Sequence, residues 1–185
     1  MDRLVPASSL LLVVDVQERL AAAMPGDSLG RLVKNTILLL EAASILNVPV
    51  VASEQYSKGL GATMAPVLER LRSVGATPVD KLSFDASAEP GIAREIARVG
   101  PRAIVVVGME AHVCVFQTAR ELVRRGHAVY VVADAVTSRT EENRRAGLTL
   151  AERAGACVTV AEAVVFDWVE RAGTDAFRAL SKLVK

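Results

Sequence analysis

Three residues whose side chains could do chemistry together stand at or beyond the ends of three predicted strands. Asp15 ends the apolar run LLLVV (10–14), Lys81 follows the run ATPVD (76–80), and Cys114 lies six residues after the glycine that closes AIVVVG (103–108). A carboxylate, an amine and a thiol in one place could serve as proton acceptor, charge stabiliser and nucleophile. The pattern indicates a crevice in which the thiol could act as a nucleophile.

Cys114 lies in the first turn of a predicted amphipathic helix, whose apolar face is formed by Val115, Ala119, Leu122 and Val123. The positive end of the helix dipole is expected to lower the pKa of the thiol and to favour a thiolate nucleophile. The alternative is a small buried hydrophobic residue, as most free cysteines are. That alternative describes Cys157, which opens a predicted strand, better than it describes Cys114.

Asp15 and Lys81 also have ordinary interpretations when each is taken alone. Asp15 at the end of a buried strand is either a proton shuttle for a thiol or a carboxylate that caps a loop. Lys81 is either a solvated surface charge or a cation that holds the carboxylate ionised in a crevice. Their convergence with Cys114 from three separate strand ends favours the functional interpretation of all three.

The elements that must position these residues follow an alternating pattern. Short β-branched runs are each followed by a segment with helical periodicity, which is typical of βαβ units. We predict a single domain over residues 1–185, with a three-layer α/β/α fold and a six-stranded, mostly parallel, Rossmann-like sheet. Ligands bind such sheets at the carboxyl ends of the strands. The predicted strands are 10–15, 48–53, 76–80, 103–108, 128–134 and 157–161, and the predicted helices are 29–46, 64–73, 90–99, 112–125, 141–154 and a pair from about 162.

Composition excludes several classes of partner. The formal net charge is +1 with acids and bases interspersed, so no basic stripe predicts nucleic-acid binding. The run LLLVV is far shorter than the ~20 residues that cross a bilayer, so no membrane partner is expected. The chain has two cysteines and no C-x-x-C pair, which favours a reducing cytoplasm. Neither G-x-G-x-x-G after the first strand nor a Walker-type loop occurs, and we expect no cofactor.

The order of four motifs resembles that of the isochorismatase-like cysteine hydrolases, a superfamily that includes nicotinamidases and N-carbamoylsarcosine amidohydrolase. The motifs are VVDVQ (13–17), VDKLSFDA (79–86), VGMEAHVCVFQTA (107–119) and VVADAVTSR (131–139), and the stretch SEQYSKGLGAT (53–63) is similar to the isochorismatase domain-containing branch. The resemblance implies an Asp15–Lys81–Cys114 triad and a cis peptide between Met109 and Glu110. It also implies an oxyanion hole formed by the backbone N–H groups of Glu110 and Cys114.

The sequence departs from this family at the metal site. Metal-dependent nicotinamidases carry an Asp-x-His pair after the second strand, where this chain has Ser53, Glu54, Gln55 and Tyr56. Three imidazole or carboxylate ligands cannot be assembled on that pattern, so no metal is expected and a nicotinamide substrate is not favoured. His112 is interpreted as a rim or capping residue, and His127 as a structural one.

We therefore predict an amidase-type hydrolase that cleaves a C–N bond of a small molecule through a covalent thioester. Two alternatives stay open: an isochorismate-type vinyl-ether hydrolase that needs Asp15 but not the thiol, and a catalytically idle binding or scaffold protein. The candidate pocket residues are Gln17, Gln55, Tyr56, Phe84 and His112.

A homo-oligomer, a dimer or larger, is the expected assembly. Relatives assemble in this way, and the apolar segment AEAVVFDWVERAG (161–173) is a candidate contact surface that includes Trp168. The same segment is equally consistent with an amphipathic helix that packs on its own sheet.

Overall fold

The computed structural model of the chain describes residues 3–184. Six parallel strands form one sheet in the order β3-β2-β1-β4-β5-β6. They are β1 (Ser9–Val14), β2 (Val50–Gln55), β3 (Val79–Lys81), β4 (Ala103–Met109), β5 (Ala128–Thr137) and β6 (Cys157–Thr159). Strand order reverses between β1 and β4, which is the doubly wound arrangement with a ligand crevice at the carboxyl ends of the strands. The predicted fold class is confirmed.

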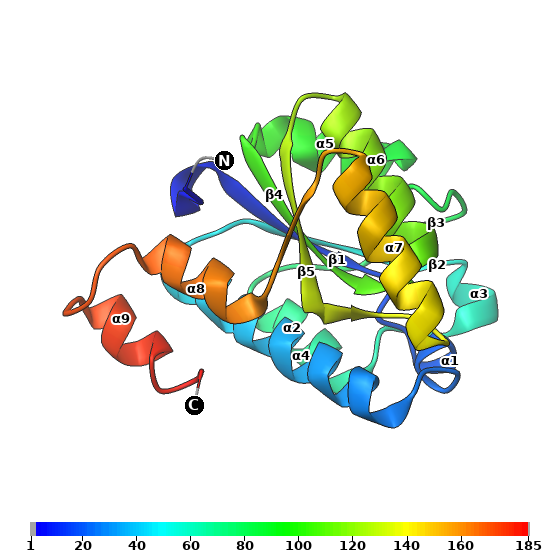
Figure 1. Ribbon diagram of the computed structural model, residues 1–185, viewed down its shortest axis with the longest axis horizontal. Coiled ribbons are helices and arrows are strands. Elements are labelled where there is room, and N and C mark those ends of the chain that lie inside the picture. Colours follow the sequence, from blue (N-terminus) through cyan, green and yellow to red (C-terminus); the bar gives the residue numbers. More distant parts are fainter. Residues whose placement is uncertain (1–2, 185) are drawn as a thin grey trace.

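Helices cover both faces of this sheet (Figure 1). The α-helices are α1 (Glu18–Ala21), α2 (Gly26–Leu46), α3 (Ser57–Leu60), α4 (Ala65–Ser73), α5 (Pro90–Val99), α6 (Phe116–Arg124), α7 (Glu141–Arg153), α8 (Ala161–Val169) and α9 (Asp175–Leu180). Two short 3₁₀ segments, η1 (Pro6–Ser8) and η2 (Ala86–Ala88), and one π-helical turn, η3 (Ala111–Val115), complete the described elements. No helix within residues 3–184 is long and apolar enough to cross a membrane.

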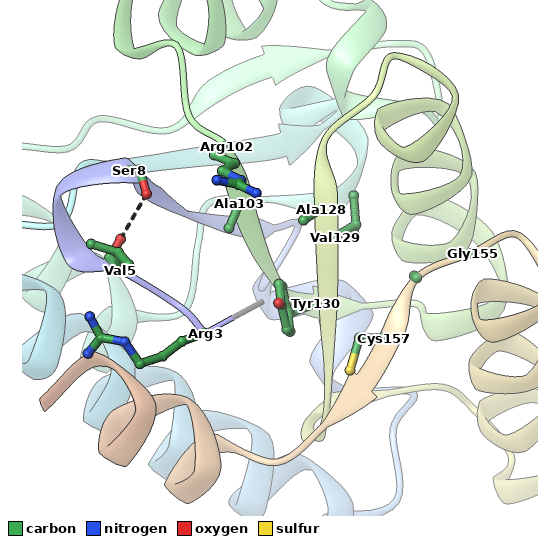
Figure 2. A pocket seen from close by; sticks show the side chains of 11 residues that line it. Arg3, Val5, Ser8, Arg102, Ala103, Ala128, Val129, Tyr130, Gly155 and Cys157 are labelled. Carbon is green, nitrogen blue, oxygen red and sulfur yellow. Dashed lines mark hydrogen bonds between the residues drawn. The ribbon is translucent and has the colours of Figure 1, made fainter. Parts of the chain in front are cut away.

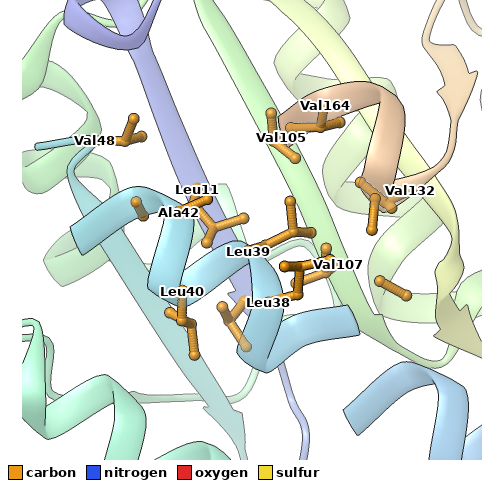
Figure 3. Packing of buried hydrophobic residues seen from close by; sticks show 14 of the residues in the cluster. Leu11, Leu38, Leu39, Leu40, Ala42, Val48, Val105, Val107, Val132 and Val164 are labelled. Carbon is orange, nitrogen blue, oxygen red and sulfur yellow. The ribbon is translucent and has the colours of Figure 1, made fainter. Parts of the chain in front are cut away.

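The two faces of the sheet are buried by different helices. Leu11 and Val13 of β1 pack with α2, α4, α8 and α9, and Figure 3 shows part of this cluster. Leu10 and Leu12 point to the other face and pack with α5, α6 and α7. Because side chains alternate along a strand, a strand buried on both sides needs apolar residues at consecutive positions. The uninterrupted apolar run at 10–14 meets that requirement.

Trp168 illustrates why the carboxyl-terminal segment belongs to this core. Its side chain on α8 is buried, and its Nε1 donates a hydrogen bond to Ser9 Oγ at 3.1 Å. The indole therefore packs on the chain's own sheet, which is the second of the two uses predicted for the segment 161–173.

The strands that carry the predicted site approach one another very closely at their carboxyl ends. A Cβ atom added to Gly108 of β4 would lie 1.9 Å from the carbonyl oxygen of Val14 in β1. The residue also has a φ of +123°, and the pairing of β4 with β5 changes register between Val106 and Gly108. Only glycine fits such a bulge. It brings the backbone after β4 against the end of β1.

Candidate active site

Asp15, Lys81 and Cys114 meet at the carboxyl ends of β1, β3 and β4. Lys81 Nζ lies 2.8 Å from Asp15 Oδ2, and the side chains of both residues are fully buried. The thiol of Cys114 is 5% exposed and interacts with both charged groups. The three residues predicted from separate strand ends therefore lie together.

Asp15 is held by its backbone and by one hydroxyl group. Its φ of +51° turns the chain sharply after β1, in a region that Asp adopts more readily than most residues. Ser53 Oγ donates to Oδ1 at 2.7 Å. The other oxygen, Oδ2, is close to Lys81 Nζ, but that contact is not aligned as a hydrogen bond, and no described residue donates one to Oδ2. Oδ2 is thus a buried anionic acceptor with a lone pair unused.

Lys81 connects the acid to the surrounding loops. Its Nζ donates to Gln55 Oε1 at 2.6 Å and to the carbonyl of Ser83 at 3.0 Å, in addition to the ion pair with Asp15. Nζ also donates to the carbonyl of Phe84 at 3.4 Å, so the three donor hydrogens of the ammonium group have three acceptors besides the carboxylate of Asp15. Gln55 in turn donates from Nε2 to the carbonyl of Leu82 at 2.9 Å. The cation is fixed in place before any ligand arrives.

Cys114 lies inside the π-helical turn rather than in the first turn of a regular helix. The N–H groups of Val113 and Val115 both donate to the carbonyl of Glu110, at 3.1 and 3.2 Å, and α6 begins only at Phe116. Single π turns of this kind are frequent at functional sites. The predicted helix 112–125 is therefore present in two parts, and the first part curls the chain around the thiol.

The pKa of the Cys114 thiol is opposite to the sequence expectation. Burial raises this pKa to about 12, and the negative charge of Asp15 adds to the rise while Lys81 opposes it. A helix terminus is worth about 0.3–1 kcal/mol at an exposed position, which is less than the cost of burying a thiolate. The expected lowering of the pKa is wrong, and the thiol is protonated at neutral pH.

Helix α7 fixes the turn that carries the thiol. A Cβ atom added to Gly147 would lie 2.4–2.5 Å from backbone atoms of Ala111 and His112. The absence of a side chain at Gly147 lets α7 pack directly on the η3 backbone. The position of the thiol therefore depends on a helix that contributes no chemical group of its own.

Three polar contacts join the same turn and its N-cap residue to the segment that follows β5. Glu110 Oε2 accepts hydrogen bonds from Arg139 N at 3.0 Å and from Arg139 Nε at 3.1 Å. His112 Nδ1 lies 3.0 Å from Ser138 Oγ. The peptide bond between Met109 and Glu110 is cis. Arg139 and Ser138 were not singled out by sequence reasoning, although they are the last two residues of the motif VVADAVTSR.

The predicted pocket residues occupy three different settings. Gln17 is buried, and its amide contacts only backbone groups of Gln55 and Gly61, so it braces two loops and lines no accessible surface. Gln55 contacts Lys81 and lies 3.9 Å from Cys114 Sγ. Tyr56 and Phe84 are half exposed at the rim. Ser53, which was noted only as a departure from a metal site, proves to be the hydrogen-bond partner of Asp15.

No group of three His, Cys, Asp or Glu side chains among residues 3–184 lies close enough to hold a metal ion. At this site Asp15 is instead neutralised by Lys81.

Fold and site together define a three-layer α/β/α protein with an acid, a lysine and a cysteine buried at the carboxyl edge of a parallel sheet. The isochorismatase domain model matches residues 9–163. The chain belongs to the isochorismatase family, and its fold is that of the family's hydrolases. Family membership suggests hydrolase activity.

Known relatives cover nearly the whole chain. It is 36% identical to the secreted isochorismatase effector Isc1 of Phytophthora sojae, with 100% of this chain and 88% of that protein aligned. It is 34% identical to isochorismatase domain-containing protein 2 of Bos taurus, over 100% of this chain and 87% of the relative. The solved structure named MAR1 ribonuclease from Caenorhabditis elegans is 34% identical, with a TM-score of 0.91 over 99% of this chain and 92% of that one.

Proposed function

We propose that the protein is an amidase-type hydrolase that cleaves a C–N bond of a small molecule with Cys114 as nucleophile. The observation that carries this proposal is the buried acid: the charge of Asp15 acts on the Cys114 thiol, and its Oδ2 accepts no hydrogen bond from the described residues. A thiol with a pKa of about 12 needs a base in direct reach to become a nucleophile. Asp15 is that base.

The first half of the reaction forms a thioester. Asp15 takes the thiol proton while Sγ attacks the carbonyl carbon, and the N–H groups of Glu110 and Cys114 receive the developing oxyanion. Asp15 then gives its proton to the amine as the C–N bond breaks. Lys81 stabilises the negative charge that passes between carboxylate and sulfur.

The second half returns the enzyme to its starting state. Asp15, again a carboxylate, accepts a proton from water as the water oxygen attacks the thioester carbonyl. The bond from carbon to sulfur breaks, the carboxylic acid leaves, and the proton held by Asp15 returns to Cys114. Because the same carboxylate acts in both halves, its loss should slow acylation as well as deacylation.

The rim of the site favours substrates with an apolar group. Tyr56, Leu82 and Phe84 are 52%, 71% and 51% exposed, although each is next to a residue that holds the buried lysine. Exposed large apolar side chains next to residues that hold the buried lysine are suited to bind hydrocarbon or aromatic parts of a small ligand.

The direct test is acylation by p-nitrophenyl acetate, followed by nitrophenolate release and by mass spectrometry of the cysteine peptides. We expect acetyl transfer to Cys114, complete loss of turnover in Cys114→Ala, and wild-type turnover in the matched variant Cys157→Ala. Circular dichroism checks that each variant is folded. Undiminished turnover in Cys114→Ala would contradict the proposal.

The raised thiol pKa also supports a second candidate, vinyl-ether hydrolysis in which the carboxyl group of Asp15, once protonated, donates the proton and the thiol takes no part. That reaction should survive Cys114→Ala and fail in Asp15→Asn. A folded protein that is neither acylated nor active would instead be a binding protein. An RNA oligonucleotide serves as a further control substrate, because a 34% identical relative is named a ribonuclease.

We further propose that the protein works in the cytoplasm as a homo-oligomer. Both cysteines are free, which suits a reducing compartment. Phe166, which is exposed on α8 within the predicted contact segment 161–173, is a candidate for the contact between subunits. Light scattering on the purified protein measures its mass directly, and a monomer at micromolar concentration would contradict this assignment.

A further inference from the structure

Gln55 is held by hydrogen bonds at both its backbone and its side chain. Its backbone N–H donates to Gln17 Oε1 at 2.7 Å, and its backbone carbonyl accepts from Gln17 Nε2 at 3.1 Å. In the side chain, Nε2 donates to the carbonyl of Leu82 at 2.9 Å, and Oε1 accepts from Lys81 Nζ at 2.6 Å. The residue is buried. The amide group is therefore fixed at the end of β2 before any ligand binds.

The same contacts determine which way the side-chain amide faces. If the amide were rotated by half a turn, its NH₂ group would meet the ammonium group of Lys81 and its oxygen would meet the carbonyl of Leu82. Both contacts would be repulsive, because an ammonium group only donates hydrogen bonds and a carbonyl only accepts them. The amide oxygen consequently faces Lys81. It also lies 3.9 Å from Cys114 Sγ, with the thiol as donor.

The amide oxygen of Gln55 competes with sulfur for the hydrogens of Lys81. The ammonium group donates to Oε1 and to two loop carbonyls, and it is paired with the carboxylate of Asp15. Burial and the charge of Asp15 raise the pKa of the Cys114 thiol, whereas Lys81 acts to lower it. A hydrogen that Lys81 gives to Oε1 is not available to stabilise a thiolate.

Several other titratable groups surround the turn that carries the thiol. Glu110 is paired with Arg139, and His112 Nδ1 contacts Ser138 Oγ. Helix α7 packs on the turn at Gly147, which has no side chain. The groups come from four parts of the chain: Asp15 after β1, Lys81 at the end of β3, Arg139 after β5, and Glu110 and His112 on the turn or its N-cap. Among them, Lys81 is the cation that acts on the thiol, so a residue that takes up its hydrogens influences the thiol as well.

We propose that Gln55 is a positioning residue that keeps the resting thiol of Cys114 protonated. Its Oε1 takes a hydrogen of Lys81 that would otherwise reach sulfur, and it is a second acceptor, beside Asp15, for the S–H group. Because the thiolate is the form that reacts with oxidants and electrophiles, the nucleophile is protected until a substrate is bound and Asp15 takes the proton. This role rests on the proposed function in that Cys114 is the nucleophile.

The test compares the rate of iodoacetamide alkylation at Cys114 in the wild type and in Gln55→Met, measured by mass spectrometry of the full chain at pH 8 and above. Methionine has a similar length to glutamine but accepts hydrogen bonds only weakly, so a hydrogen of Lys81 becomes available to sulfur. We expect the rate in Gln55→Met to be about tenfold higher at a given pH, which corresponds to a profile shifted by about one unit to lower pH.

A second variant, Gln55→Glu, should have the opposite effect. The carboxylate still accepts a hydrogen bond from Lys81, but it adds a negative charge that faces the thiol, and alkylation of Cys114 should slow several-fold at the same pH. The opposite signs are informative because a wider opening to the site would speed alkylation in both variants.

Cys157 is the internal control in every variant. It is the first residue of β6 and lies in the wall of a separate cavity at the amino ends of the strands (Figure 2). Its alkylation rate should not change, and equal acceleration at both cysteines would mean that the substitution loosens the whole fold. That result, or a Gln55→Met profile that is unshifted or moved to higher pH, would overturn the proposal.

The outcome can be separated from that of the proposed function by measuring acetyl transfer from p-nitrophenyl acetate on the same wild-type preparation. If Cys114 is acetylated but the Gln55→Met profile is unshifted, the role of Gln55 is wrong and the hydrolase proposal stands. If Cys114 is not acetylated but the profile shifts as expected, the role of Gln55 stands and the hydrolase proposal is wrong.

Discussion

The ion pairs at the two ends of the same sheet differ in their exposure to solvent. At the carboxyl ends of the strands, Asp15 and Lys81 form an ion pair with no exposed surface, beside a thiol that is itself buried. At the amino ends, Arg3 pairs with Glu170 at the same distance of 2.8 Å, but their side chains are 39% and 60% exposed. Equal distances therefore do not mean equal energies.

The physical reason for the difference is solvent. Water screens the exposed pair, so its net contribution to stability is small. The buried pair has given up its hydration and is stable only while both partners are present with their hydrogen bonds. A functional site needs the second arrangement because fixed charges act strongly on a reacting group in a low-dielectric setting.

The largest expected contrast is between Lys81→Met and Arg3→Met. Removal of Lys81 leaves Asp15 as an uncompensated buried charge, and we expect the free energy of unfolding to fall by about 3–5 kcal/mol. Removal of Arg3 breaks an exposed pair and should cost about 0–1 kcal/mol. Urea denaturation of both variants at neutral pH measures the two values.

The double variant Asp15→Asn/Lys81→Met provides the control. It removes both buried charges, so much of the stability lost in Lys81→Met should return. If Lys81→Met and Arg3→Met lower the free energy of unfolding by the same amount, water reaches the pair of Asp15 and Lys81 in solution. The two ends of the sheet would then not differ in how their charges are solvated.

The second contrast concerns what raises the thiol pKa of each of the two cysteines, and how fast the more deeply buried one reacts. The pKa of Cys114 is raised to about 12 by burial and by the charge of Asp15, whereas the pKa of Cys157 is raised by burial and by Glu152. A raised pKa leaves less thiolate at neutral pH. At pH 8 we expect Cys114 to be alkylated about a hundredfold more slowly than free glutathione, after allowing for the greater nucleophilicity of a more basic thiolate.

The sign of the pH dependence follows from the same values. The alkylation rate at Cys114 should keep rising as pH increases well beyond the free-thiol value of ~8.5. Asp15→Asn removes one cause of the raised pKa and should move the profile to lower pH. Faster alkylation of Cys114 than of glutathione at pH 8 would mean that the thiol pKa is lowered, as the helix dipole predicts, and not raised by burial.

Sequence reasoning reached the fold and the three central residues by local patterns. Alternating runs predicted the parallel sheet because each pattern depends on residues close together in the chain. Asp15, Lys81 and Cys114 were found because strands of one sheet bring their carboxyl ends to one edge. Residues that are brought together in this way can be predicted without knowing the exact distances between them.

The environment of those residues could not be predicted in the same way. The contact of Gln55 with Lys81 spans 26 positions, and that of Glu110 with Arg139 spans 29. Such contacts depend on side-chain placement in three dimensions. The prediction of a lowered thiol pKa was wrong for a related reason. The position of a residue on a helix can be predicted from the sequence, whereas its depth of burial beside an acid cannot.

The smallest contrast compares two serines at opposite ends of the sheet, Ser53 near the carboxyl end of β2 and Ser8 just before β1. Ser53 Oγ donates to the buried carboxylate of Asp15 at 2.7 Å, whereas Ser8 Oγ makes an exposed contact of 3.4 Å with the carbonyl of Val5. We expect Ser53→Ala to lower the free energy of unfolding by about 1.5–3 kcal/mol, because a buried charge loses a donor. Ser8→Ala should change it by less than about 0.5 kcal/mol. Thermal and urea unfolding of both variants measure these values, and a Ser53→Ala variant as stable as Ser8→Ala would mean that water replaces the hydroxyl group and that the site is open to solvent.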